Sequence, residues 1–141
     1  VKGFAAIRRT WKPGDTVELS LPMPVRRVVS HEKVEANAGR VALERGPVVY
    51  CAEAVDNGGK VFNLVLPDDA PLEAGRRDDL LGGLRVIEGR ALGLSPAPDG
   101  RSVVTQEQAF VAVPYYAWAH RGQGEMAVWL PRRVQLDFRV P

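Results

Sequence analysis

The stretch with the most chemical potential is an aromatic one in the last third of the chain. It places Tyr115, Tyr116 and Trp118 close together and follows them with Arg121 and the glycine-rich segment 122–124. Aromatic faces stack on the apolar faces of sugar rings, and a guanidinium donates hydrogen bonds to hydroxyl groups. These four side chains are therefore candidate sugar-binding residues. The structural alternative is core filling, and strand alternation predicts that at least one of the aromatics faces inward.

The single cysteine, Cys51, points to packing more than to chemistry. One cysteine cannot form an intramolecular disulfide, and a cysteine-rich zinc site cannot be assembled within this chain. Cys51 lies in an apolar run, which predicts burial, as is common for free cysteine. A role as nucleophile would need a base beside it, and His31 and His120 are the only histidines.

Paired carboxylates would be needed for glycoside hydrolysis, at a separation of ~5–9 Å across a cleft. Glu53, Glu107 and Glu125 are candidates, but their spacing singles out no pair. The glycine-rich motifs that bind phosphates and the Gly-x-Ser-x-Gly nucleophile elbow are absent from the sequence. The sequence therefore predicts no catalytic residue, no cofactor-binding residue and no metal ligand in this chain.

Composition excludes two further classes of partner. The 141 residues include 19 Lys and Arg against 17 Asp and Glu, for a net charge of +2. This balance is unlike the basic face of a nucleic-acid-binding protein. No apolar run approaches the ~18–20 residues of a membrane helix, so we expect neither nucleic acid nor membrane as a partner. The lone cysteine slightly favours the cytoplasm. The missing initiator methionine predicts a piece of a larger protein.

The elements that must position these residues are short strands separated by turns. Residues 16–21 alternate strictly between apolar and polar, which is the period of a half-buried strand. Residues 3–11 indicate another strand, and the Pro-Gly-Asp turn at 13–15 between the two predicts a hairpin. We expect this hairpin to pack against the β-sandwich that the later strands form, or against a second copy of the chain.

The remainder of the chain continues this pattern. Residues 47–53 are apolar at nearly every position, which predicts a central strand covered on both faces. The Asp-Asn-Gly-Gly sequence at 56–59 is a strong turn signal, and residues 67–83 indicate a loop. Further strands are expected at 61–66, 84–94 with a bulge or bend at Gly89, 102–113 and 134–140. Many short strands with frequent turns predict an all-β, antiparallel β-sandwich, jelly-roll-like in arrangement.

Three segments, in order, resemble one known family. The segment 113–131, Val-Pro-Tyr-Tyr-Ala-Trp-Ala-His-Arg-Gly-Gln-Gly-Glu-Met-Ala-Val-Trp-Leu-Pro, resembles the C-terminal motif of glycoside hydrolase family 127. Residues 3–23 and 39–51, the latter reading Gly-Arg-Val-Ala-Leu-Glu-Arg-Gly-Pro-Val-Val-Tyr-Cys, resemble two earlier blocks of the same family. These are the β-L-arabinofuranosidase-type enzymes and their bacterial relatives.

The resemblance implies an architecture larger than this chain. Family members carry an N-terminal (α/α)6 barrel that holds the active site, with a cysteine nucleophile in a zinc site and a glutamate acid/base. None of those motifs occurs here, and Cys51 does not take over the nucleophile's role. The resemblance divides the chain into residues 1–24, remnant strands of a preceding sandwich, and residues 25–141, a C-terminal sandwich.

Two functions remain open on this basis. The first is a non-catalytic accessory region that supports the catalytic barrel, a homodimer, or both. The alternative is a carbohydrate-binding module that uses the aromatic cluster on a plant-type oligosaccharide.

Overall fold

The structure is a computed structural model that describes residues 3–134, and this part of the chain is all-β. The strands are β1 (Val25–Val28), β2 (Arg40–Arg45), β3 (Val48–Glu53), β4 (Leu64–Val65), β5 (Leu72–Arg77), β6 (Leu84–Pro96), β7 (Val103–Pro114), β8 (Met126–Ala127) and β9 (Leu130–Pro131). Three single 3-10 turns accompany them, η1 (Glu35–Asn37), η2 (Ala54–Asp56) and η3 (Tyr115–Ala117). Among the described residues there is no helix long and apolar enough to cross a membrane.

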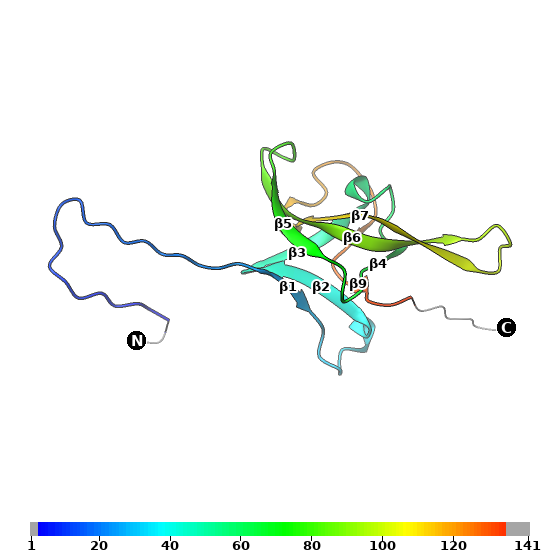
Figure 1. The fold of residues 1–141 in the computed structure, drawn as a ribbon, viewed down its shortest axis with the longest axis horizontal. Coiled ribbons are helices and arrows are strands. Elements are labelled where there is room, and N and C mark those ends of the chain that lie inside the picture. The colour runs from blue at the N-terminus through cyan, green and yellow to red at the C-terminus, as the bar shows by residue number, and fades with distance from the viewer. Residues whose placement is uncertain (1–2, 135–141) are drawn as a thin grey trace.

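The strands pair in the order β1-β2-β3-β7-β6-β4, with β5 beside β6, β8 beside β3 and β9 beside β2, and every pairing is antiparallel. The sheet curls so that β1 contacts β5 and β4 contacts β9 (Figure 1). Arg27 of β1 donates a hydrogen bond to the carbonyl of Ala70 at 2.8 Å, next to β5. The result is a sandwich-like fold, which confirms the predicted fold class.

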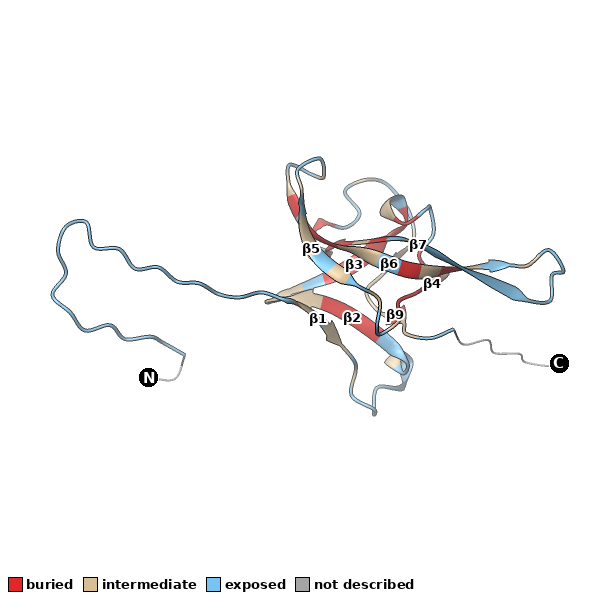
Figure 2. Ribbon diagram, in the orientation of Figure 1, coloured by how far each residue is buried: buried red, intermediate tan, exposed pale blue. Residues whose placement is uncertain are grey.

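β3 is the central strand, and both of its faces are buried from Tyr50 to Glu53, whereas Val49 near its start is exposed (Figure 2). Tyr50 and Ala52 point into the main core, where they meet Phe110, Ile87 and other apolar side chains. Cys51 points the other way, into a second cluster with Val86, Val113 and Ala117. Because successive strand residues face opposite sides, an unbroken apolar run is what a strand between two cores requires. The prediction of a strand covered on both faces is confirmed for residues 50–53, while the strand begins only at Val48 and its first two residues are not buried.

The turn predicted at 56–59 forms directly after β3 and η2. Gly58 and Gly59 have φ of 71° and 85°, a backbone conformation that side chains with a Cβ rarely adopt. The strand expected at 61–66 is shorter than predicted and is reduced to β4. The strand expected at 134–140 lies, apart from its first residue, outside the described residues.

Two expectations for the middle of the chain are wrong. The segment 67–83, expected to be a loop, contains β5, which pairs with β6 along its whole length. Gly89 forms no bulge, because it pairs in register with both Leu72 and Phe110. Its backbone is instead approached so closely that an added Cβ would lie 2.2 Å from the carbonyl oxygen of Pro71. Gly89 is therefore needed for close packing.

The N-terminal hairpin is also absent from the structure. The turn at its centre forms, since the amide of Asp15 donates to the carbonyl of Lys12 at 3.0 Å and the Asp15 carboxylate accepts from the Lys12 amide at 2.8 Å. However, residues 3–24 contain no strand and extend away from the sheet (Figure 1). A two-stranded hairpin is marginally stable without a third strand or a helix to pack on. Val17, Leu19 and Leu21 therefore stay exposed.

Candidate functional site

The predicted aromatic cluster lies where β7 ends. η3 follows Pro114 directly, and the turn replaces strand alternation with a tight curve. Tyr115, Tyr116 and Trp118 are 45%, 68% and 38% exposed in this chain, while the small Ala117 takes the buried position. The expectation that an aromatic faces inward is wrong for this reason. The rings of Tyr115 and Trp118 lie against each other, with centroids 6.2 Å apart and planes tilted by 34°.

Arg121 is engaged by two carboxylates from the end of β3 and from η2. Its guanidinium donates to Asp56 at 2.7 and 2.5 Å and to Glu53 at 2.6 Å. The three side chains are 14%, 12% and 8% exposed for Arg121, Asp56 and Glu53. The pKa of Arg121 is raised, and the largest cause is the hydrogen bond to Asp56. Burial acts in the opposite direction, and the hydrogen bond to Glu53 raises the pKa further. The guanidinium of Arg121 is therefore directed at these two carboxylates and holds its own loop against β3 and η2.

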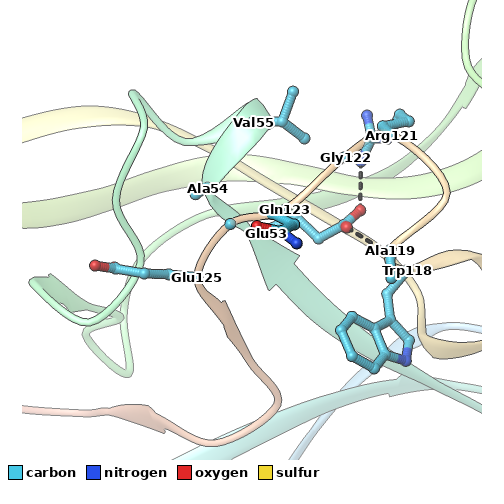
Figure 3. Close-up of a pocket in the computed structure, with 10 residues that line it drawn as sticks. Glu53, Ala54, Val55, Trp118, Ala119, Arg121, Gly122, Gln123 and Glu125 are labelled. Carbon is cyan, nitrogen blue, oxygen red and sulfur yellow. Dashed lines mark hydrogen bonds and ion pairs between the residues drawn. The ribbon is translucent and has the colours of Figure 1, made fainter.

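Glu53 also holds the backbone beside Trp118. Its second oxygen accepts a hydrogen bond from the amide of Ala119 at 2.9 Å (Figure 3). Ala119 has φ of 66°, a left-handed conformation that costs energy in a residue with a Cβ. The charge-assisted bond to Glu53 stabilises this conformation. This hydrogen bond therefore determines the direction of the backbone after Trp118.

Two further polar side chains complete the framework. Asn57, which is buried, donates to the carbonyls of Glu53 at 2.8 Å and Val111 at 2.9 Å and accepts from the Val111 amide at 3.0 Å. Glu125 accepts from the amides of Val61 at 2.7 Å and Phe62 at 2.9 Å. These bonds, that of Phe62 first, lower the pKa of the Glu125 carboxyl. The turn after β3 is thus tied to β7 and to the segment before β8.

A cavity of about 380 Å³ opens between these segments. Its lining includes Glu53, Val55, Trp118, Gln123 and Glu125 (Figure 3). Of the four predicted residues, Trp118 and Arg121 line it, while Tyr115 supports Trp118 from outside and Tyr116 is not part of the lining. Sequence reasoning considered Glu53 and Glu125 only as generic carboxylates. Their partners lie 63 to 68 residues away along the chain, so no local signal could have marked them.

The other candidates for chemistry do not converge on this cavity. Cys51 is buried, and burial, followed by the nearby charge of Glu53, raises the pKa of its thiol to about 12. A thiol that stays protonated is neither a nucleophile nor a metal ligand. His31 and His120 are exposed, and Glu107 lies 3.9 Å from Arg90 on the surface.

A zinc ion of the kind expected for the family's catalytic barrel does not fit this part of the protein. Residues 3–134 contain no group of three or more His, Cys, Asp or Glu side chains that could hold a metal ion. The thiol of Cys51, the sole cysteine, faces apolar neighbours in the second cluster.

Comparison with known proteins places this fold in one family. The family model described as the glycoside hydrolase family 127 C-terminal domain matches residues 25–131. A non-reducing end β-L-arabinofuranosidase from Bifidobacterium longum subsp. longum is 37% identical, over 84% of this chain and 20% of its own length.

Solved structures agree with this match. A family 127 β-L-arabinofuranosidase from Geobacillus stearothermophilus superposes with a TM-score of 0.71 at 49% identity, over 78% of this chain and 18% of that one. A second family 127 β-arabinofuranosidase, BT3674, superposes with a TM-score of 0.73 at 46% identity, over 77% and 17% of the two chains.

The chain spans about a fifth of the length of these relatives. The family match covers residues 25–131 and so includes the two segments, 39–51 and 113–131, on which the resemblance was read. The chain therefore belongs to glycoside hydrolase family 127, and residues 25–131 form the family's C-terminal domain.

Proposed function

We propose that this chain acts as the non-catalytic C-terminal accessory region of a β-L-arabinofuranosidase-like glycoside hydrolase, where it supports the (α/α)6 catalytic barrel of the same polypeptide. The observation that carries the proposal is the state of the charged groups at the candidate site. Glu53 and Asp56 are both bound to Arg121, and Glu125 is bound to two backbone amides. Carboxylates held in this way stabilise loops. They leave no carboxyl group free to protonate a glycosidic oxygen as an acid or to attack the sugar as a nucleophile.

The exposed N-terminal arm, residues 3–24, supports a docking role. It leaves Phe4, Ile7, Trp11, Leu19 and Leu21 all more than half exposed. Large apolar side chains in such a row mark a surface that is covered in the working protein. The occupant we propose is the upstream part of the same polypeptide, because the relatives extend far beyond the matched region. There the two halves of the arm would complete the strands of a preceding sandwich.

Homodimerisation through this domain is the second half of the proposal. The outer ends of β6 and β7 form a ribbon that projects beyond the other strands (Figure 1). Val103 and Val104 are exposed on it, one on each face, which gives a second copy an apolar side chain to contact on either face. Light scattering of the parent protein, with and without Val104→Asp, measures this directly. We expect a mass of two chains, and a lower mass for the variant.

The experiment that tests the accessory role uses an aryl β-L-arabinofuranoside. The 141-residue chain should release no aryl alcohol above the buffer rate, whereas the parent polypeptide should do so. In that parent, Leu19→Asp should lower the melting temperature and the soluble yield, because it places a charge in the docking surface. Turnover by the isolated chain, or a parent unaffected by Leu19→Asp, would overturn the proposal.

A further inference from the structure

The cavity beside Trp118 has walls that are fixed before any ligand arrives. Arg121 joins the loop to Glu53 and Asp56, and Glu53 sets the conformation of Ala119 next to Trp118. Glu125 ties the opposite wall to residues 61 and 62. Small-molecule sites are mostly preformed cavities of ~300–1,000 Å³, and this one measures about 380 Å³. Its rigidity lowers the entropic cost of binding a small ligand.

The lining combines an aromatic face with exposed polar groups. Trp118 is partly exposed at the cavity and is supported by the ring of Tyr115 at 6.2 Å. Gln123 lies between Trp118 and Val55 in the view of Figure 3, on a segment flanked by two glycines. A carboxamide both donates and accepts hydrogen bonds, as a hydroxyl does. An indole beside an amide suits a molecule with an apolar face and a rim of hydroxyl groups.

The charges of the lining decide between classes of small molecule. Two carboxylates, Glu53 and Asp56, bind the single guanidinium of Arg121 at or next to the cavity. A third, Glu125, lies on the opposite wall. This excess of negative charge disfavours a phosphate, a uronate or another anion. The carboxylates are also already satisfied by hydrogen bonds, which leaves little to attract a cation. A neutral polyol fits best.

We propose that this cavity is a subsite for one neutral sugar unit of pentose size, with Trp118 as the stacking surface and Gln123 as the hydrogen-bonding group. Arg121 is a positioning residue that holds the loop in place, and Tyr116 makes no contact with the sugar. The site goes beyond the accessory role, since it would hold a carbohydrate chain near the enzyme. The choice of arabinose among pentoses rests on the proposed function.

Titration of the 141-residue chain with L-arabinose and with methyl β-L-arabinofuranoside tests the subsite. The readout is the NMR signal of the Trp118 indole N–H, which the Trp118→Ala spectrum identifies. We expect a saturable shift with a dissociation constant on the order of 1 mM. Gln123→Ala should weaken binding about fivefold, a loss typical of one hydrogen bond. Both side chains are exposed, and thermal unfolding of each variant checks that it folds.

Tyr116→Ala is the matched control, because Tyr116 is an exposed aromatic neighbour outside the cavity. It should leave the affinity unchanged. The proposal fails if no sugar gives a saturable shift, if Trp118→Ala still binds in calorimetry, or if Tyr116→Ala loses binding equally. It also fails if spermidine shifts the indole signal and the sugars do not, since the cavity would then be a cation site. None of these failures touches the accessory role, which is tested separately on the parent polypeptide.

Discussion

At the scale of single residues, one guanidinium connects the parts of the candidate site. Arg121 binds carboxylates at the end of β3 and in η2, more than sixty positions earlier in the chain. The aromatic residues around it were visible in the sequence because they are neighbours in it. Their exposure was not, because a 3-10 turn and a buried Ala117 replaced the expected alternation. The ionic contacts of Arg121 join distant segments and leave no local pattern to read.

Removing this guanidinium should destabilise the domain strongly. Arg121→Met leaves Glu53 and Asp56 facing each other without a counter-charge in a largely buried place, which typically costs about 3–5 kcal/mol. Urea unfolding followed by circular dichroism measures the loss. Arg90→Met is the matched control, because Arg90 pairs with Glu107 at 3.9 Å on the surface. Exposed pairs contribute about 0–1 kcal/mol, so equal effects of the two substitutions would contradict the role given to Arg121.

Glu125 gives the domain a defined dependence on pH. Its pKa is lowered from the ordinary 4.5 by hydrogen bonds from the amides of Phe62 and Val61. A carboxyl with a lowered folded-state pKa contributes stability that is fully present above its unfolded pKa and is lost as the pH falls through the folded one. The contribution should therefore fade as the pH drops below about 4.5. Melting temperatures from pH 7 to pH 3 should fall less steeply for Glu125→Gln, and parallel profiles would refute this.

At the scale of elements, the sequence predicted those strands whose environment is uniform. β3 lies between two cores and is apolar from Val48 to Ala52, and β6 and β7 are long and pair continuously. β5 was missed because its residues include Gly75 and two arginines and are no more than half-buried. Its pairing with β6 is a tertiary effect that overrides weak local preference. The hairpin of the arm was predicted from its alternating pattern. It does not form, because the described residues offer no further strand for it to pack on.

A substitution at Gly89 tests how closely β6 is packed against the segment that leads into β5. Gly89→Ala places a methyl group 2.2 Å from the backbone oxygen of Pro71, which cannot move aside cheaply. Overpacking of this kind costs about 1–3 kcal/mol. Gly75→Ala on β5 is the control, since its nearest neighbour at 3.1 Å is the end of the flexible Glu88 side chain. Chemical unfolding should separate the two variants, and an equally stable Gly89→Ala would show that the segment yields.

At the scale of the whole molecule, residues 3–134 consist of a curled body and the arm of residues 3–24. We expect trypsin to cut the isolated chain first in the arm, at Arg8 or Arg9, because these sites are exposed on backbone without strands. Mass spectrometry of early digests identifies the cuts. In the parent polypeptide the same bonds should be protected at least tenfold if the arm is covered by upstream strands. Equal cutting rates in both proteins would contradict the docking surface.

The position of β3 has a consequence for how the body holds together as a unit. β3 pairs with β7 on one side and with β2 and then β8 on the other, and it supplies Glu53 to the loop that carries Trp118. The pairing order passes from β2 to β7 through it, and the contacts of β1 with β5 and of β4 with β9 close the sheet at its other edges. The body therefore lacks a seam along which it could open in halves, and we expect it to unfold cooperatively. The cavity should vanish in the same transition as the core, with no stage at which one is lost and the other kept.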